Sequence, residues 1–350
     1  MHYSLPRASF ALISVMTLQT VLPVPGFASE KPTTVNIENF IRAETDTYFQ
    51  KAVKSGAFGK LVHRTEMASI EAQDVVRLNR DTLYSSGVFD LDAGPVSVTL
   101  PDTDTRFMSM QVLSEDHYTN EVVYAPGTYT YSKDKVGTRY VMLVIRTFAN
   151  PESASDIKSA NDLQKSIKVE QSEIGSFEIP KWEAQSQAKV RKALATLAMS
   201  LGSGSSKMFG DKAHVDPVAH LIGTSIGWGG NPAEAAIYRS VYPKLNDGKT
   251  VYKLNIKDVP VDGFWSISVY DGEGFFKKNP LNKYSLNSVT AKRESDKSVN
   301  IQFGDCKSST PNCLPIMKDW NYTVRLYRPR QEITDGRWEF PEAQPATQQK

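Results

Sequence analysis

The spacing of hydrophobic residues changes along the chain and divides it into helical and β segments. Residues 33–59 have apolar positions at helical spacing and end near a glycine, which predicts one amphipathic helix. From Val75 the period becomes two, in short segments separated by turn residues, which predicts an antiparallel β domain of about six strands or more. The apolar face predicted for the helix consists of Ile37, Phe40, Ile41, Tyr48 and Ala52.

A polar stretch with two predicted helices follows this β region. We expect a short helix at Ala160–Ile167 and a longer one after Pro180, which ends at Gly202. The period of two then returns in the segments "TVYKLNI", "GFWSISVYD", "SVNIQFG" and "YTVRLYRP". These patterns predict a mainly β fold with helical connectors, arranged as two tandem antiparallel β-sandwiches of jelly-roll type. The stripe of the longer helix, interpreted as core packing, is Val190, Leu194, Leu197 and Leu201.

The first 28 residues have the pattern of a secretory signal peptide. A weakly basic start precedes the apolar run "ASFALISVMTLQTVL", and Gly26 and Ala28 provide the small residues of a cleavage site. The alternative is a membrane anchor, which the short apolar run and the following prolines disfavour. We therefore predict a periplasmic or secreted protein with no stable membrane span after cleavage. Its predicted parts are a helical segment (29–74), a first sandwich (75–150), a helical connector (151–232) and a second sandwich (233–345).

Composition narrows the class of partner and the redox compartment. The formal net charge is +2 and no run of like charge occurs, so the chain has no electrostatic footprint for nucleic acid. The chain has two cysteines, Cys306 and Cys313, seven positions apart around a polar turn. In an exported chain this spacing favours a local disulfide over two free thiols.

Sequence signatures of well-known catalytic and cofactor sites are not found, so we expect no cofactor and no metal. In "HVDPVAH" the residues His214, Asp216 and His220 have loose ligand spacing, and we favour helix capping or surface hydrogen bonds over a zinc site. His117 follows Asp116 at the end of a strand. It is a candidate general base because its ordinary pKa lies near neutrality, although an unpartnered loop histidine is the simpler interpretation.

Two short motifs are candidates for a ligand site. "NRDTLY" could bind an anionic or sugar-like ligand through Arg80 and Tyr84, with Asn79 and Asp81 beside them, or could form a buried polar network at the start of a strand. "GWGGNP" surrounds Trp228 with glycines, so the loop either presents Trp228 to a ligand or turns tightly against it.

These motifs resemble two known families. The stretch "NRDTLYSSGVFDLDAGPVSVTLPD" resembles domain of unknown function 1254, and "FWSISVYD" with "RLYRP" resembles domain of unknown function 1214. Together they extend from about Thr34 to Pro345. The resemblance implies two jelly-roll-type sandwiches in tandem and no settled activity. Many members carry a Trp before the Leu-Pro near the end of the second domain. Cys313 occupies that place here, and the resemblance makes a disulfide with Cys306 a replacement for the lost packing.

Two functions of different classes fit these observations. The first is a protein that binds a small polar molecule, or a cofactor-independent hydrolase, with its site between the two sandwiches. Asp81 and His117 would then act as acid or base. The alternative is a structural or assembly protein whose sandwiches form interfaces, and a homo-oligomer is left open. The residues expected to bind the ligand are Asn79, Arg80, Tyr84 and Trp228.

Overall fold

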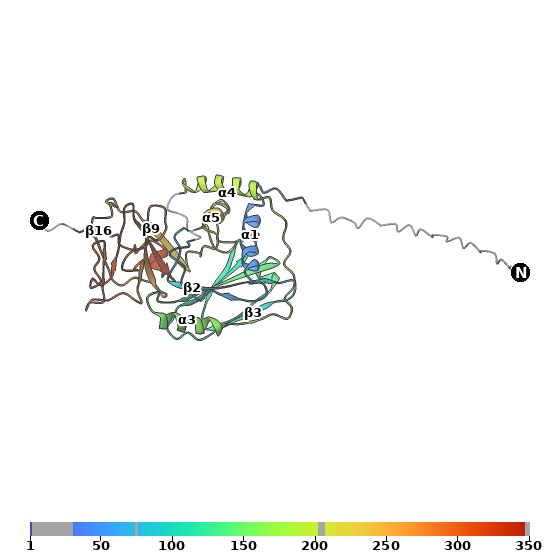
Figure 1. The fold of residues 1–350 in the computed structure, drawn as a ribbon, viewed down its shortest axis with the longest axis horizontal. Helices are drawn as coiled ribbons and strands as arrows, with labels where there is room; N and C mark the ends of the chain where they lie inside the picture. The colour runs from blue at the N-terminus through green and yellow to red at the C-terminus, as the bar shows by residue number, and fades with distance from the viewer. Residues whose placement is uncertain (2–30, 74–75, 202–206, 347–350) are drawn as a thin grey trace.

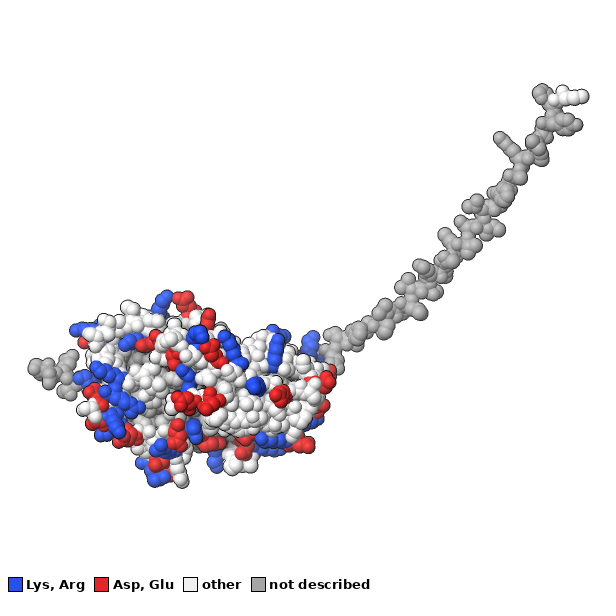
Figure 2. All heavy atoms as spheres, turned by 90° about the horizontal axis from the view of Figure 1, so that it is seen from below, with Lys and Arg blue, Asp and Glu red and all other residues white. Residues whose placement is uncertain are grey.

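The computed structural model describes residues 31–73, 76–201 and 207–346, in addition to Met1. The predicted signal peptide lies outside these ranges. The structure is mainly β with helical connectors, as the periodicity predicted, and its two β halves lie side by side (Figure 1). Within the described ranges, no helix is long and apolar enough to cross a membrane. Positive and negative side chains are interspersed over one face of the molecule (Figure 2).

The first half is a sandwich of two antiparallel sheets. The larger sheet has the order β1-β2-β7-β4-β5 and the smaller one the order β6-β3-β8. Their apolar faces meet in a core that includes Phe89, Val98, Met110, Leu143 and Ile145. The larger sheet comprises β1 (Val62–His63), β2 (Thr82–Asp90), β7 (Tyr140–Phe148), β4 (Met108–Ser114) and β5 (Thr119–Tyr124). The smaller sheet comprises β6 (Gly127–Tyr131), β3 (Val96–Leu100) and β8 (Lys168–Glu170).

Helices cover part of the outer face of the larger sheet, and most residues of β4 and β7 are buried on both faces. Helix α1 (Phe40–Lys54) packs on β2, and α4 (Ala184–Ala198) and α5 (Pro217–Gly227) pack against α1 and each other. Helix α3 (Ala154–Lys165) contacts β7. It begins six residues before the predicted helix because Ser153 caps it there, accepting a hydrogen bond from the Asp156 N–H. Helix α2 spans Lys133–Val136.

The predicted apolar faces of α1 and α4 each include one residue that is exposed in the structure. Ile37 precedes α1 and is 65% exposed, and α1 instead buries the polar residues Glu44 and Asp46. Both carboxylates have partners from the 151–232 connector: Arg191 pairs with Glu44, and the Trp182 indole N–H donates to Asp46. Leu197 is also exposed, although the remainder of the α4 stripe packs as predicted.

The second half consists of two four-stranded sheets that enclose their own core. One sheet has the order β12-β11-β15-β9 and is antiparallel throughout. The other has the order β14-β13-β10-β16, in which β14 pairs parallel to β13. Jelly-roll connectivity in either half stays a prediction. The strands are β9 (Ala236–Val241), β10 (Tyr252–Ile256), β11 (Trp265–Tyr270), β12 (Ser285–Asn287), β13 (Val299–Phe303), β14 (Cys313–Leu314), β15 (Asn321–Tyr327) and β16 (Gln344–Pro345), with helix α6 at Gln331–Thr334.

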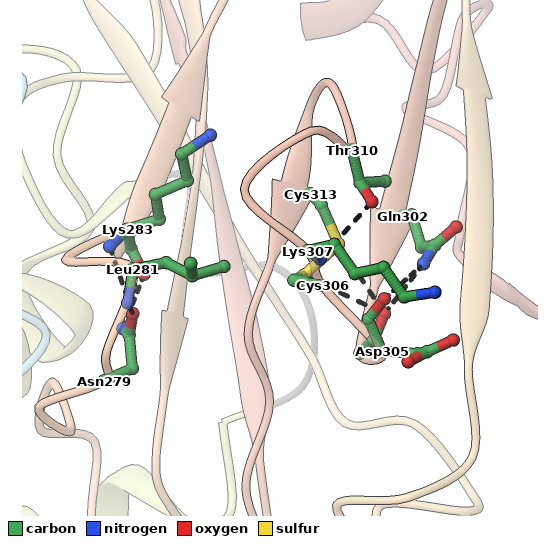
Figure 3. The surroundings of a disulfide bond; sticks show 10 residues. Asn279, Leu281, Lys283, Gln302, Asp305, Cys306, Lys307, Thr310 and Cys313 are labelled. Atoms are coloured by element: carbon green, nitrogen blue, oxygen red, sulfur yellow. Dashed lines mark hydrogen bonds between the residues drawn. A yellow bond between two sulfur atoms is a disulfide. The ribbon is translucent and has the colours of Figure 1, made fainter.

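The predicted disulfide is present in the second half. Cys306 and Cys313 are bonded across a separation of seven residues, with their Cα atoms 5.6 Å apart. Figure 3 shows the bond closing the loop between β13 and β14, next to Gln302 and Asp305. It joins the loop to the start of β14, the strand that carries Cys313.

Candidate functional site

A cleft of about 600 Å³ lies between the two halves, within the size range of ligand pockets in proteins. Its floor in the first half is the outer face of β2 and β7, and its other side comes from β9 and β15. The end of α5 and the segment 76–79 close the remaining sides. The cleft is therefore built from residues that are far apart in the sequence.

Four arginines line this cleft, and none of the described residues that line it is an aspartate or glutamate. They are Arg64, Arg77, Arg146 and Arg325. Arg146 is 7% exposed and Arg325 is 2% exposed. Within the described ranges, none of these four arginines lies within 4.0 Å of a carboxylate oxygen. The arginines that do so belong to other parts of the protein. The lining of the cleft therefore has an excess of positive charge. Buried cations ordinarily have an anionic partner, which makes this excess unusual.

Arg325 belongs to the second half, and three hydrogen bonds hold its guanidinium in place. Its guanidinium donates to the Ser268 Oγ at 3.0 Å, the Tyr270 Oη at 2.7 Å and the Arg77 carbonyl oxygen at 2.8 Å. The Arg77 side chain in turn donates to the Asn321 Oδ1 at 2.7 Å. These neutral acceptors orient both guanidinium groups, and within the described ranges neither forms an ion pair within 4.0 Å.

Arg146 comes from the first half and is held by a glycine-rich turn. It donates to the Gln111 Oε1 at 2.9 Å, and the Gln111 amide donates to the Gly230 carbonyl at 2.9 Å. Gly229 has a φ of 77°, a conformation that glycine adopts at little cost. The "GWGGNP" segment thus supports the network that positions a cleft arginine.

Tyr84 lies between these arginines. It pairs directly with Arg146 across β2 and β7, and its hydroxyl accepts a hydrogen bond from the Asn79 amide at 3.2 Å. Burial opposes ionisation of the phenol, but Arg146, the hydrogen bonds of Thr82 and Asn79, and Arg325 together hold the pKa of Tyr84 below its ordinary value. A phenol in this field can accept or release a proton next to a bound anion.

Asn79 and Asp81 fix the start of β2 against the second half. The Asn79 Oδ1 accepts from the Asp81 backbone N–H at 2.8 Å and so caps the turn before β2. The Asp81 carboxylate accepts from the Ser266 hydroxyl at 2.5 Å, across the two halves. Burial raises the pKa of Asp81, and Arg325 and the Ser266 hydrogen bond only partly offset this. Asn79 lines the cleft, whereas Asp81 is fully buried behind it.

His117 is buried behind the same turn and does not line the cleft. Its Nε2 accepts from the Gly229 N–H at 2.8 Å, so its proton is on Nδ1, which faces the Thr224 Oγ1 at 2.8 Å. Burial and the neighbouring His220 lower the pKa of His117 to about 3. A neutral ring with both nitrogens engaged positions the turn. A direct role of His117 in acid–base chemistry stays a prediction, because His117 does not contact the cleft.

Trp228 lines the cleft at one edge and is packed on its other sides. Its indole N–H donates to the Thr45 Oγ1, and its ring stacks on Tyr48 at a centroid distance of 4.2 Å and on His117 at 5.4 Å. The tryptophan packs against a tight turn and also presents a surface to the cleft.

The remaining predicted residues lie elsewhere. Arg80 points away from the cleft, donates to the Ala68 carbonyl and lies over the Tyr284 ring. Asp216 caps α5 by accepting from two backbone N–H groups, as the capping interpretation predicted. The buried arginines of the cleft were missed by sequence reasoning. Their signal is a single arginine inside an apolar strand, in "VIRTF" and "YTVRLY".

Comparisons with known proteins agree with this architecture and assign no activity. No curated protein matches the chain. The VPA0106 protein from Vibrio parahaemolyticus has a solved structure with a TM-score of 0.69, at 19% identity, covering 89% of this chain and 98% of its own. An uncharacterized protein from Burkholderia cenocepacia is structurally similar at a TM-score of 0.48 and 11% identity, covering 88% and 86%. The first likeness supports the fold alone.

Two family matches cover parts of the two halves. Residues 58–136 match "Protein of unknown function (DUF1254)", which includes β1 to β6 and the polar start of β2. Residues 243–331 match "Protein of unknown function (DUF1214)", which includes β10 to β15. Arg77 falls in the first segment and Arg325 in the second. The chain therefore carries a DUF1254 segment followed by a DUF1214 segment, two uncharacterised families in tandem, as its motifs predicted.

Proposed function

We propose that this protein binds a small anion in the cleft between its two halves. The observation that carries the proposal is the pair Arg146 and Arg325, one from each half. Both are more than nine-tenths buried, and neither lies within 4.0 Å of a carboxylate in the described part of the chain. This pair supports a small anion as the ligand of the predicted site between the two sandwiches.

The physical argument concerns the cost of buried charge. Removing an ion from water costs several kcal/mol even after relaxation, and a partner of opposite charge offsets this. Arg77 adds a third cation to the same cleft. A bound carboxylate, phosphate or sulfate would supply the negative charge, and the planar guanidinium fork suits two of its oxygens.

Tyr84 and Asn79 would complete the site. Both line the cleft, and Tyr84 lies between the two buried arginines as a hydrogen-bonding group for the ligand. We also propose that the protein acts outside the cytoplasm. The Cys306–Cys313 disulfide supports this, since such bonds persist in oxidising compartments.

The test is a titration of purified protein with acetate, phosphate and sulfate, followed by calorimetry and thermal unfolding. An anion at about a hundred times its Kd should add about 2.7 kcal/mol to the free energy of unfolding. Arg146→Met should weaken binding about 10- to 150-fold, the equivalent of a charged hydrogen bond worth about 1.5–3 kcal/mol.

Arg330→Met is the matched control, because Arg330 is an exposed arginine paired with Asp262 and does not line the cleft. It removes the same charge and should leave anion affinity unchanged. Equal weakening by both variants would show a general effect of net charge. That result, or no binding of any anion, would contradict the proposal.

A further inference from the structure

We infer that the natural ligand is an amphiphilic organic anion, with an anionic head at the arginines and an apolar body along the first half. This inference rests on the proposed anion site and specifies what its ligand carries besides charge. It is based on how polarity changes along the floor of the cleft.

The floor changes from cationic to apolar along β7. Arg146, Val144 and Met142 are alternate residues of one strand, so their side chains lie on the same face of the sheet. At about 3.3 Å per residue, the distance from Arg146 to Met142 along the strand is about 13 Å. On β2, Tyr84 pairs with Arg146 and Ser86 pairs with Val144. The charged groups thus lie at one end of the floor and the hydrocarbon groups at the other.

The end of α5 adds apolar side chains beside this part of the floor. Ile226 and Trp228, at the end of α5, line the cleft together with Phe209. Trp228 packs in one apolar cluster with Met142 and Val144. The ring of Phe209 lies directly against Gly230, where a Cβ would collide with it, so the wall is close-packed and defined in shape.

Two apolar side chains that line the cleft are exposed to water. Ile226 is 50% exposed and Val76 is 57% exposed, and both line the cleft. An inorganic anion would contact the arginines only and leave this surface wet. A ligand with a hydrocarbon or aromatic body would bury it, which is favourable in proportion to the apolar area removed from water.

The experiment is a calorimetric series of acetate, butanoate, hexanoate and octanoate against the purified protein. We expect Kd to fall about three- to fourfold for each added methylene, the ratio that corresponds to 0.8 kcal/mol per buried CH₂. Octylammonium has the same alkyl chain and the opposite charge, and it should not bind.

A variant at the rim tests the position of the alkyl chain. Ile226→Gln should weaken octanoate binding about fivefold and leave acetate unchanged, because a half-exposed isoleucine loses about half of its burial energy. Val289→Gln is the control, since Val289 is similarly exposed on the second half and does not line the cleft.

The outcomes separate the two proposals. If acetate binds but affinity does not increase with chain length, the ligand class is wrong and the anion site stands. If octanoate affinity is unchanged by Ile226→Gln, the alkyl chain binds elsewhere and the inference fails. If no anion of the series binds, the proposed function and this inference both fail.

Discussion

Replacing Arg146 with methionine should leave the ligand-free protein nearly as stable as the original. Methionine has a similar length and no charge, so the change removes the guanidinium without opening a large cavity. A residue that is retained for ligand binding should behave in this way. A residue that holds the fold together should not.

The magnitude follows from two opposing effects. The variant loses the hydrogen bond from Arg146 to the Gln111 Oε1, a bond to a charged group worth about 1.5–3 kcal/mol. The second contact, to the Gly229 carbonyl, is 3.5 Å long and contributes little. The variant also removes a buried cation whose desolvation costs several kcal/mol. Because these effects nearly cancel, we expect a change of at most about 2 kcal/mol in the free energy of unfolding.

The assay is urea unfolding at neutral pH in a buffer of weakly binding anions, with Arg330→Met measured in parallel. The denaturant slope should be unchanged, which shows that the native fold is retained. A loss of about 3–5 kcal/mol, the range found when one partner of a satisfied buried charge is removed, would refute the reasoning. Arg146 would then be a structural residue.

Three further predictions concern titratable groups. Burial raises the pKa of Asp46 to about 7, so the folded state retains a proton that the unfolded state releases near pH 4. Its contribution to stability therefore falls by up to roughly 4 kcal/mol as pH rises from 4 to 7, and Asp46→Asn should remove this fall in urea unfolding at pH 5 and 8. The pKa of Tyr84 is lowered, so anion affinity should drop as alkaline pH creates a phenolate in the cleft. Tyr84→Phe should abolish that drop in calorimetry between pH 7 and 10, and an unchanged wild-type Kd would contradict it. His117→Phe should cost about 1–3 kcal/mol because it leaves the Gly229 N–H unpaired, and unaltered urea unfolding would count against a positioning role.

The sequence was most informative where one face of a strand meets the core and the other meets water. The segment "VSVTL" shows this alternation, and the same five residues form β3, Val96–Leu100. Strand β2 begins at Thr82, inside the polar motif that was interpreted as a strand start. Its outer face there, at Tyr84 and Ser86, lines the cleft and carries no apolar pattern, so the alternation alone does not reveal this part of the strand.

The choice between neighbouring arginines could not be made from the sequence. Arg77 and Arg80 lie in an irregular segment, where no period fixes the direction of a side chain. The backbone of Arg77 adopts a φ of 55°, and Arg77 reaches the cleft while Arg80 points away. The buried polar face of α1 was missed for a related reason, since Glu44 and Asp46 depend on partners more than a hundred residues away.

Because arginines from both halves line the cleft, the two segments depend on each other during evolution. Without the second half the cleft would lose Arg325, one of its four arginines, and Arg325 is itself held in part by the carbonyl of Arg77 from the segment before β2. A gene encoding either half alone would specify a sandwich with an incomplete cleft. If the proposed anion site is the function, selection on it would act on both segments together, because separating them would remove the site. The two segments are therefore best studied together, as one unit with one cleft.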